Sequence, residues 1–320
     1  TRSSASCKPT DSNSYRAASR ADHRPRPQRP VLQSFLKNAR YVLSSIWQEP
    51  SNRHQRVKRL VLFFGWQLWK RTVRKPILVP LFNGLRFRAY PDCHMSSAVM
   101  YTRIPDSRDI LYLRTHMGQG TLIDVGANVG LVTLLLADKL LHALLFEPNS
   151  IAAGRARANL ELNGLRFEVH EIALSDTTGT VEFEDEGGVS SCNRTVVGFS
   201  TSVPTRIVPC MQLDRFLADH VPPYPISVIK IDVEGHENSV LRGMLDCLRR
   251  HRPRVVMFEY LQRTNLRESI ALFQTAGYTV LQLTRGGAEI ATADAQPLQD
   301  LFACPHELVR EFTAENGANA

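Results

Sequence analysis

The residues best suited to chemistry lie in the run 229–237, Ile-Lys-Ile-Asp-Val-Glu-Gly-His-Glu. Its apolar start predicts a strand, and four ionisable residues follow at the carboxyl end, where open α/β sheets bind their ligands. We expect Asp232 in the site, and Asp232 and His236 are the candidates for a general base. Alternatively, His236 is a surface histidine, and Glu237 simply favours the start of a helix.

A glycine-rich turn follows another predicted strand, in the run 122–130, Leu-Ile-Asp-Val-Gly-Ala-Asn-Val-Gly. The strand ends in Asp124, the chain turns at Gly126, and Gly130 opens a helix. Asn128 stands where a dinucleotide-binding motif has its second glycine, and the Lys-Ser/Thr ending of a phosphate-binding loop is absent. The turn therefore argues against a pyrophosphate and favours a smaller, positively charged ligand. A plain tight strand–helix turn is the alternative.

Three more carboxylates follow predicted strands. Glu147 ends the strand after the glycine turn and is expected to accept hydrogen bonds from both hydroxyls of a ribose. The alternative is an acid that favours a helix N-terminus. Asp176 ends the third strand, where it either meets an adenine amino group or begins the turn at 177–179. Glu259 closes the fifth strand, where it either lines an acceptor pocket or acts as a capping acid.

These residues need a parallel sheet to bring them together. Short apolar runs alternate with helical segments from about residue 108, which predicts a doubly wound, mostly parallel α/β sheet covered on both faces. The expected strands are 121–125, 143–147, 167–174, 226–232, 254–259 and 278–283. The expected helices are 131–141, 149–162, 237–250 and 266–276. Extra strands are expected at 180–184 and 195–199, and a hairpin is expected at 77–90, with its turn at Asn83-Gly84.

Charge is unevenly distributed along the chain. The net charge is +8 over 320 residues, but residues 1–75 carry 17 Lys and Arg against 3 Asp and Glu, and the remainder carries 22 against 28. We expect residues 1–30 to form a disordered basic tail, 31–76 a helical basic extension and 77–320 the catalytic domain. The basic amphipathic segment 53–75 either contacts an anionic membrane surface or packs its apolar face on the domain.

Two features of the sequence concern targeting. No apolar run is long enough to span a bilayer, and residues 1–30 lack the apolar core of a signal peptide. Six cysteines with irregular spacing form no metal-binding pattern, so free thiols are expected. A cytoplasmic location is the resulting expectation.

Several of these runs, taken in order, resemble the FkbM family of S-adenosylmethionine (SAM)-dependent methyltransferases over roughly residues 100–285. The runs are IDVGANVG, FEPN, IALSD with a following glycine, QLDRFL, IKIDVEGHE and VVMFEY. Gln212 departs slightly from the family pattern, which usually has threonine there. The resemblance implies a Rossmann-like class I methyltransferase fold with a seven-stranded sheet, and SAM as the cofactor.

The resemblance also assigns roles to individual residues. It implies that the segment 232–237 lies beside the transferred methyl, that Glu147 holds the ribose and that Asp176 lies near the adenine. The methionine part of SAM would be surrounded by Asp124, Gly126, Asn128 and Gly130.

The expected reaction is O-methylation of a hydroxyl on a sugar, glycolipid or secondary metabolite by in-line displacement, in which orientation supplies much of the rate. An acidic pocket suits a cationic cofactor that becomes neutral once its methyl leaves. A metal is not expected, because Asp232 and Glu234 lack a third ligand at a secure spacing.

Two other functions are compatible with the fold class. The glycine turn and the acidic strand end argue against an NAD-dependent oxidoreductase. The net charge of −6 over residues 76–320 argues against an RNA-modifying or nucleic-acid-binding protein, so no nucleic-acid partner is expected. Neither the acceptor's identity nor the oligomeric state follows from any of these motifs.

Overall fold

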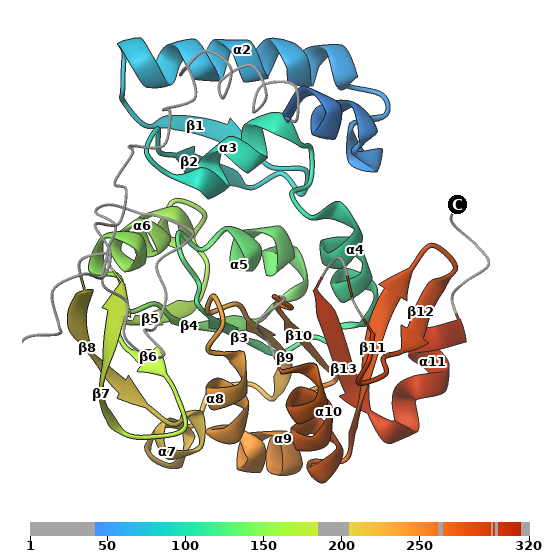
Figure 1. Cartoon of the computed structure of the whole chain (residues 1–320). Coiled ribbons are helices and arrows are strands. Elements are labelled where there is room, and N and C mark those ends of the chain that lie inside the picture. Colours follow the sequence, from blue (N-terminus) through green and yellow to red (C-terminus); the bar gives the residue numbers. More distant parts are fainter. Residues whose placement is uncertain (1–41, 185–204, 262–264, 296, 298–299, 315–320) are drawn as a thin grey trace, which may run out of the picture. The chain divides into compact units, whose positions relative to one another are not determined.

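The computed structural model describes residues 42–184, 205–261, 265–295, 297 and 300–314. Its main feature is an eight-stranded sheet in the order β12-β11-β13-β10-β9-β3-β4-β5 (Figure 1). The strands are β3 (Thr121–Val125), β4 (His142–Phe146), β5 (Phe167–His170), β9 (Ile226–Ile231), β10 (Val255–Phe258), β11 (Tyr278–Thr284), β12 (Gly287–Ile290) and β13 (Leu301–Pro305). The five strands from β5 to β10 pair in parallel, and β13, β11 and β12 extend the sheet in antiparallel pairs.

The predicted doubly wound, mostly parallel sheet is thus confirmed, but the predicted count of seven strands is one too low. β12 and β13 were not predicted individually. The chain moves outward from β3 through β4 to β5, and in the other direction from β9 to β10, so the strand order reverses between β3 and β9. Ligands of such sheets bind at this reversal, beyond the carboxyl ends of the strands.

Both faces of the sheet are buried, because alternate side chains of each strand point to opposite faces. Leu122 and Leu145 belong to one apolar cluster, and Ile123 and Leu144 belong to the other. The first face is covered by α4 (Ser107–His116), α5 (Leu131–Leu136) and α6 (Ser150–Glu161). The second face is covered by α7 (Leu213–Asp219), α8 (Glu237–Arg242), α9 (Leu245–His251) and α10 (Leu266–Thr275) (Figure 1).

One predicted helix, 237–250, is in fact two, α8 and α9. The chain breaks at Gly243, where an added Cβ would lie 2.0 Å from the carbonyl oxygen of Ser175. This approach brings the helix pair against a small second sheet of order β6-β8-β7. Its strands are β6 (Ala173–Leu174), β7 (Gly179–Glu184) and β8 (Thr205–Met211). The predicted strand 180–184 is therefore present, and the predicted strand 195–199 lies outside the described residues.

The segment before the sheet contains the predicted hairpin, formed by β1 (Ile77–Pro80) and β2 (Arg86–Ala89). Gly84 of its turn has φ 86°, in the left-handed region that glycine favours. The helix α2 (Arg56–Thr72) packs on α3 (His94–Tyr101), and the indole of Trp66 donates a hydrogen bond to Ser97. A short helix, α11 (Val309–Ala314), ends the described chain.

Two further properties concern the described part of the chain. No helix in it is long and apolar enough to cross a membrane. Cys93, Cys210, Cys247 and Cys304 are buried and carry free thiols. The division of the chain at residues 30 and 76 stays a prediction.

Candidate functional site

The glycine turn after β3 is shaped by its protein neighbours. Gly126 has φ 73°, and a Cβ added there would lie 1.9 Å from the backbone oxygen of Asp232. The backbone N–H of Asp232 in turn donates to the carbonyl of Val125 at 3.0 Å. Glycine is therefore needed at 126 because the ends of β3 and β9 approach so closely, and not because a ligand requires the space. At Gly130, which has φ 74°, an added Cβ would lie 3.3 Å from the Ala156 side chain on α6.

Asn128 lies at the tip of this turn with φ 50°, a left-handed conformation that asparagine tolerates better than most residues. Its backbone N–H donates to a carboxylate oxygen of Glu147 at 2.8 Å. Its side-chain oxygen is buried and has no hydrogen-bond partner. A buried polar atom without a partner costs about 1–3 kcal/mol, so a ligand that donates a hydrogen bond here would be favoured.

Glu147 follows β4 and is 6 % exposed. One oxygen accepts from the Asn128 backbone, and the other accepts from the backbone N–H of Asn149 at 2.8 Å. Asn149 also caps α6, because its side chain accepts from the backbone N–H groups of Ile151 and Ala152. Burial raises the pKa of Glu147 to about 7, although the two backbone hydrogen bonds and Lys230 act in the opposite direction. Each carboxylate oxygen keeps a free lone pair for a further donor.

Lys230 lies in the site although it was not predicted there from the sequence. Its ammonium group is 3 % exposed and lies 3.4 Å from Asp124 and 3.3 Å from Asp232. It also donates to the carbonyl of Gly126 at 2.8 Å. Burial alone would lower the pKa of Lys230, but the two carboxylates outweigh it and raise the pKa. The signal was present in the sequence, because a lysine inside an apolar buried strand requires a charged partner.

Asp124 is completely buried beneath the turn and does not line the cavity described below. One of its oxygens accepts from the hydroxyl of Thr133 at 2.7 Å, and the other faces Lys230. The carboxylate thus supports the turn from below instead of forming part of the cavity wall.

Three carboxylates converge at the carboxyl ends of β9 and β10. Oxygens of Asp232, Glu234 and Glu259 lie within 4.8 Å of one another. Burial, followed by the charges of Asp232 and Glu234, raises the pKa of Glu259 to about 9. Glu259 thus places a third carboxylate beside Asp232 and Glu234, which the spacing along the sequence did not reveal. At this pKa, Glu259 therefore holds a proton at neutral pH.

Asp176 and His236 lie away from the cavity wall. Asp176 pairs with Arg242 of α8 at 2.9 Å. The Nε2 atom of His236 lies 2.9 Å from the hydroxyl of Ser175, and burial lowers the pKa of the imidazole. Through these two interactions, the segment that follows β6 is connected to α8 and to the residue before it. The structure therefore does not bring them together with Glu147 and Asp232.

One cavity of about 880 Å³, part of which is open to solvent, is lined by Asn128, Glu147, Lys230, Asp232 and Glu234. Gly130 and Glu259 do not line it. Its wall combines the turn at 126–129 and the segment 146–149 with Lys230 and the segment 232–234. Apolar side chains complete the wall, among them Phe146, Ile172 and Leu174, together with Met95 and Phe183, which the sequence did not indicate.

The cavity fits a nucleoside that carries a positive charge. Glu147 offers lone pairs to hydroxyl donors, and the side-chain oxygen of Asn128 lacks a donor. Asp232 and Glu234 supply negative charge on the same wall, and apolar side chains offer a face for a base. SAM, the predicted cofactor, has all of these parts.

Comparison with known proteins agrees with this description. Residues 124–280 match the family model described as a methyltransferase FkbM domain. The hexuronic acid methyltransferase AglP of Haloferax volcanii is 28% identical over 127 residues, which cover 40% of this chain and 51% of that protein. The chain thus matches about half the length of this relative.

Solved structures also resemble the chain. A SAM-dependent methyltransferase from Agrobacterium tumefaciens superimposes with a TM-score of 0.40 and 12% identity, covering 72% of this chain and 69% of that chain. The 16S rRNA N2 G1207 methyltransferase of T. thermophilus, in complex with AdoMet and guanosine, gives a TM-score of 0.39 and 13% identity, covering 72% of this chain and 50% of that chain.

The family match begins at Asp124 and contains the glycine turn, Glu147 and the run 229–237. It therefore includes the motifs from which SAM and a Rossmann-like class I fold were predicted, and SAM is the cofactor expected of the family. Over residues 124–280, just under half of its length, the chain matches the methyltransferase FkbM domain.

Proposed function

We propose that this protein transfers a methyl group from SAM to a hydroxyl of a sugar-containing acceptor. The observation that carries the proposal is that one cavity has both Glu147 with Asn128, which suit a nucleoside, and Asp232 with Glu234, which suit a cation and a proton transfer. The partial match to a hexuronic acid methyltransferase supports a sugar as the acceptor.

The cofactor would be held by groups that are already fixed. Glu147 accepts the ribose hydroxyls on the lone pairs left free by its two backbone donors. The unpartnered side-chain oxygen of Asn128 accepts from the amino group of the methionine part. Phe146 and Leu174 pack on the adenine. Asp124 acts indirectly, because it supports the turn and holds Lys230 in place.

Asp232 is the proposed base, because it lines the cavity while His236 does not. SAM supplies a methyl carbon activated by the neighbouring positive sulfur. The acceptor oxygen forms the new bond to this carbon, the pair from the broken sulfur–carbon bond stays on sulfur, and the hydroxyl proton passes to the Asp232 carboxylate. A positioned base of this kind contributes roughly 10²–10⁴-fold to the rate.

The charge of the site favours a neutral acceptor. Asp232 and Glu234 line the cavity, while Lys230 is already paired with Asp124 and Asp232. Carboxylates accept hydrogen bonds readily from sugar hydroxyls, whereas an acceptor that carries its own carboxylate would meet like charges. We therefore propose a neutral sugar hydroxyl in preference to a uronate.

Isotope-labelled SAM and a panel of neutral and acidic sugar acceptors test this function. We expect calorimetric binding of SAM and not of NAD, and transfer of label to a neutral sugar. Asp232→Asn should bind SAM and lower kcat by about 10²–10⁴-fold. Asp219→Asn, which changes an exposed carboxylate on α7, should leave kcat unchanged. Absence of heat with SAM would refute the cofactor site, and full activity of Asp232→Asn would refute the base.

We also propose that the helix α2 contacts an anionic membrane surface. Its inner face packs on the domain through Phe63 and Trp66. Its outer face exposes Val57, Val61, Phe64 and Leu68, each between 60% and 72% exposed, at the spacing of one helical stripe. The segment 53–75 contains eight Lys and Arg and no Asp or Glu. An apolar stripe in a basic segment matches anionic lipid in charge as well as in polarity.

A further inference from the structure

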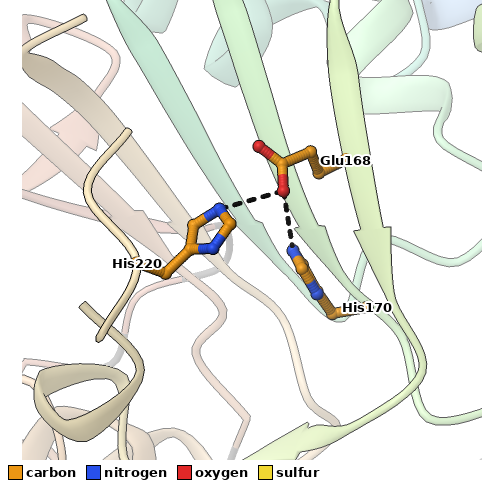
Figure 2. A group of neighbouring side chains, drawn as sticks. All are labelled: Glu168, His170 and His220. Carbon is orange, nitrogen blue, oxygen red and sulfur yellow. Dashed lines mark ion pairs between the residues drawn. The ribbon is translucent and has the colours of Figure 1, made fainter. Parts of the chain in front are cut away.

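A second group of ionisable side chains lies on the edge strand β5, outside the cavity. Glu168 and His170 are two residues apart on β5 and so point to the same face of the sheet. His220 follows directly after α7, some 50 residues further along the chain. Figure 2 shows both imidazole rings directed at the Glu168 carboxylate. None of the three side chains lines the cavity that contains Glu147 and Asp232.

The distances in this group match the ligand spacing of a metal site. The Nε2 atom of His220 lies 2.9 Å from Oε2 of Glu168, and Nε2 of His170 lies 3.6 Å from the same oxygen (Figure 2). All three ligand atoms lie within 4.8 Å of one another. Ligands about 2.1 Å from a tetrahedral zinc ion are about 3.4 Å apart, and the two measured separations lie on either side of that value.

Hydrogen bonding alone leaves this group incomplete. The Nε2 atom of His170 is buried and has no hydrogen-bond partner, since the Glu168 oxygen is too distant. A cation placed between this nitrogen, the Glu168 carboxylate and the second imidazole would be bound by all three.

The surroundings hold the ligands in position. The His170 ring stacks on Phe146, with centroids 5.3 Å apart, and Phe216 contacts both imidazoles, at 4.7 Å from His170 and 4.9 Å from His220. The buried His142 directs its Nε2 atom at the other oxygen of Glu168, at 3.5 Å. Metal ligands are commonly oriented by a second layer of this kind.

We propose that Glu168, His170 and His220 bind one divalent transition-metal ion, for which zinc is the best match in ligand type. Two imidazoles and one carboxylate are ligands that zinc prefers. The ion would join β5 at the edge of the sheet to the end of α7. It would also help to fix the position of Glu147 in the cofactor cavity, because the carbonyl of His170 accepts a hydrogen bond from the backbone N–H of Glu147 at 3.0 Å. The proposal does not depend on the proposed methyl transfer.

The test is zinc titration of the full-length chain after treatment with a chelator, followed by calorimetry and thermal unfolding. Cys7 and Cys192 are replaced by serine throughout, so that they do not compete for the ion. We expect one zinc per chain and a higher Tm with zinc. His170→Ala and His220→Ala should each abolish both effects, and His142→Ala should weaken binding by about tenfold.

His251→Ala changes an exposed histidine at the end of α9 and serves as the matched control, which should bind zinc like the parent. Circular dichroism checks that each variant is folded. If the parent binds no zinc, or if His170→Ala and His220→Ala bind it like His251→Ala, the proposal is wrong. SAM titration of the same samples is an independent readout, so a failure of the proposed methyltransferase function would be recognised separately.

Discussion

Individual residues of the cavity were largely predictable from the sequence, because glycine turns and strand-terminal acids occur at fixed places in this kind of sheet. Glu147 and Asn128 line the cavity as expected. Asp124 and Asp176 do not, since each carboxylate is held by another part of the protein, Asp124 by Lys230 and Asp176 by Arg242. A sequence indicates which residues reach the end of a strand, but not what each side chain meets there.

Cofactor affinity should depend on the ionisation of Glu147. The pKa of this group is raised from 4.5 to about 7, so charging it opposes folding as the pH rises across that range. The charged form, however, is the better acceptor for ribose hydroxyls and the better partner for a cation. We expect SAM to bind about tenfold more weakly at about pH 6 than at about pH 8, as measured by calorimetry. Glu147→Gln should bind weakly at both pH values, and an unchanged pH profile in this variant would exclude Glu147 as the cause.

Lys230 should contribute strongly to stability. Lys230→Met leaves Asp124 buried beside an apolar side chain, and breaking a buried ion pair in this way costs about 3–5 kcal/mol. We expect the loss in urea unfolding. Adding Asp124→Asn removes the uncompensated charge, so the double variant should be less destabilised than the sum of the two single variants. Additive effects would show that the two side chains do not interact.

At the scale of elements, the central parallel strands were predicted because short apolar runs alternate with helical segments along the chain. The break between α8 and α9 was missed because it depends on the approach of Gly243 to Ser175, a contact between distant parts of the chain. β13 was missed although it is fully buried, since the short apolar run Leu-Phe-Ala-Cys-Pro has no periodicity that separates a strand from a helix.

The outer stripe of α2 leads to a prediction about this element. Phe64→Ser combined with Leu68→Ser should weaken binding to anionic vesicles by at least about tenfold in a sedimentation assay. In the parent protein, both apolar side chains move from water into the membrane surface on binding, and this favourable transfer is lost in the variant. Raising the salt concentration should weaken binding of the parent protein as well. Ile207→Ser with Val221→Ser replaces two apolar residues elsewhere that are at least as exposed, and it is the control. Equal binding by the two double variants would exclude α2 as the contact.

At the scale of the whole molecule, charge and topology explain both what could be predicted and what could not. The acidic excess beyond residue 75 was visible in the sequence, and the structure adds that three of these acids, Glu147, Asp232 and Glu234, line one cavity. The group of Glu168, His170 and His220 was not foreseen. Its members come from β5 and from the far end of α7, and only the folded sheet brings them together.

The two backbone donors on Glu147 have a consequence for how a ligand arrives. Asn128 belongs to the turn after β3 and Asn149 begins α6, so the carboxylate connects two separate loops before any ligand is present. A ribose would therefore meet an acceptor whose rotamer is already set. Little conformational entropy would therefore be lost at this end of the cavity when the ligand binds. Most of the side chains that become ordered on binding would be those on the side where the acceptor enters.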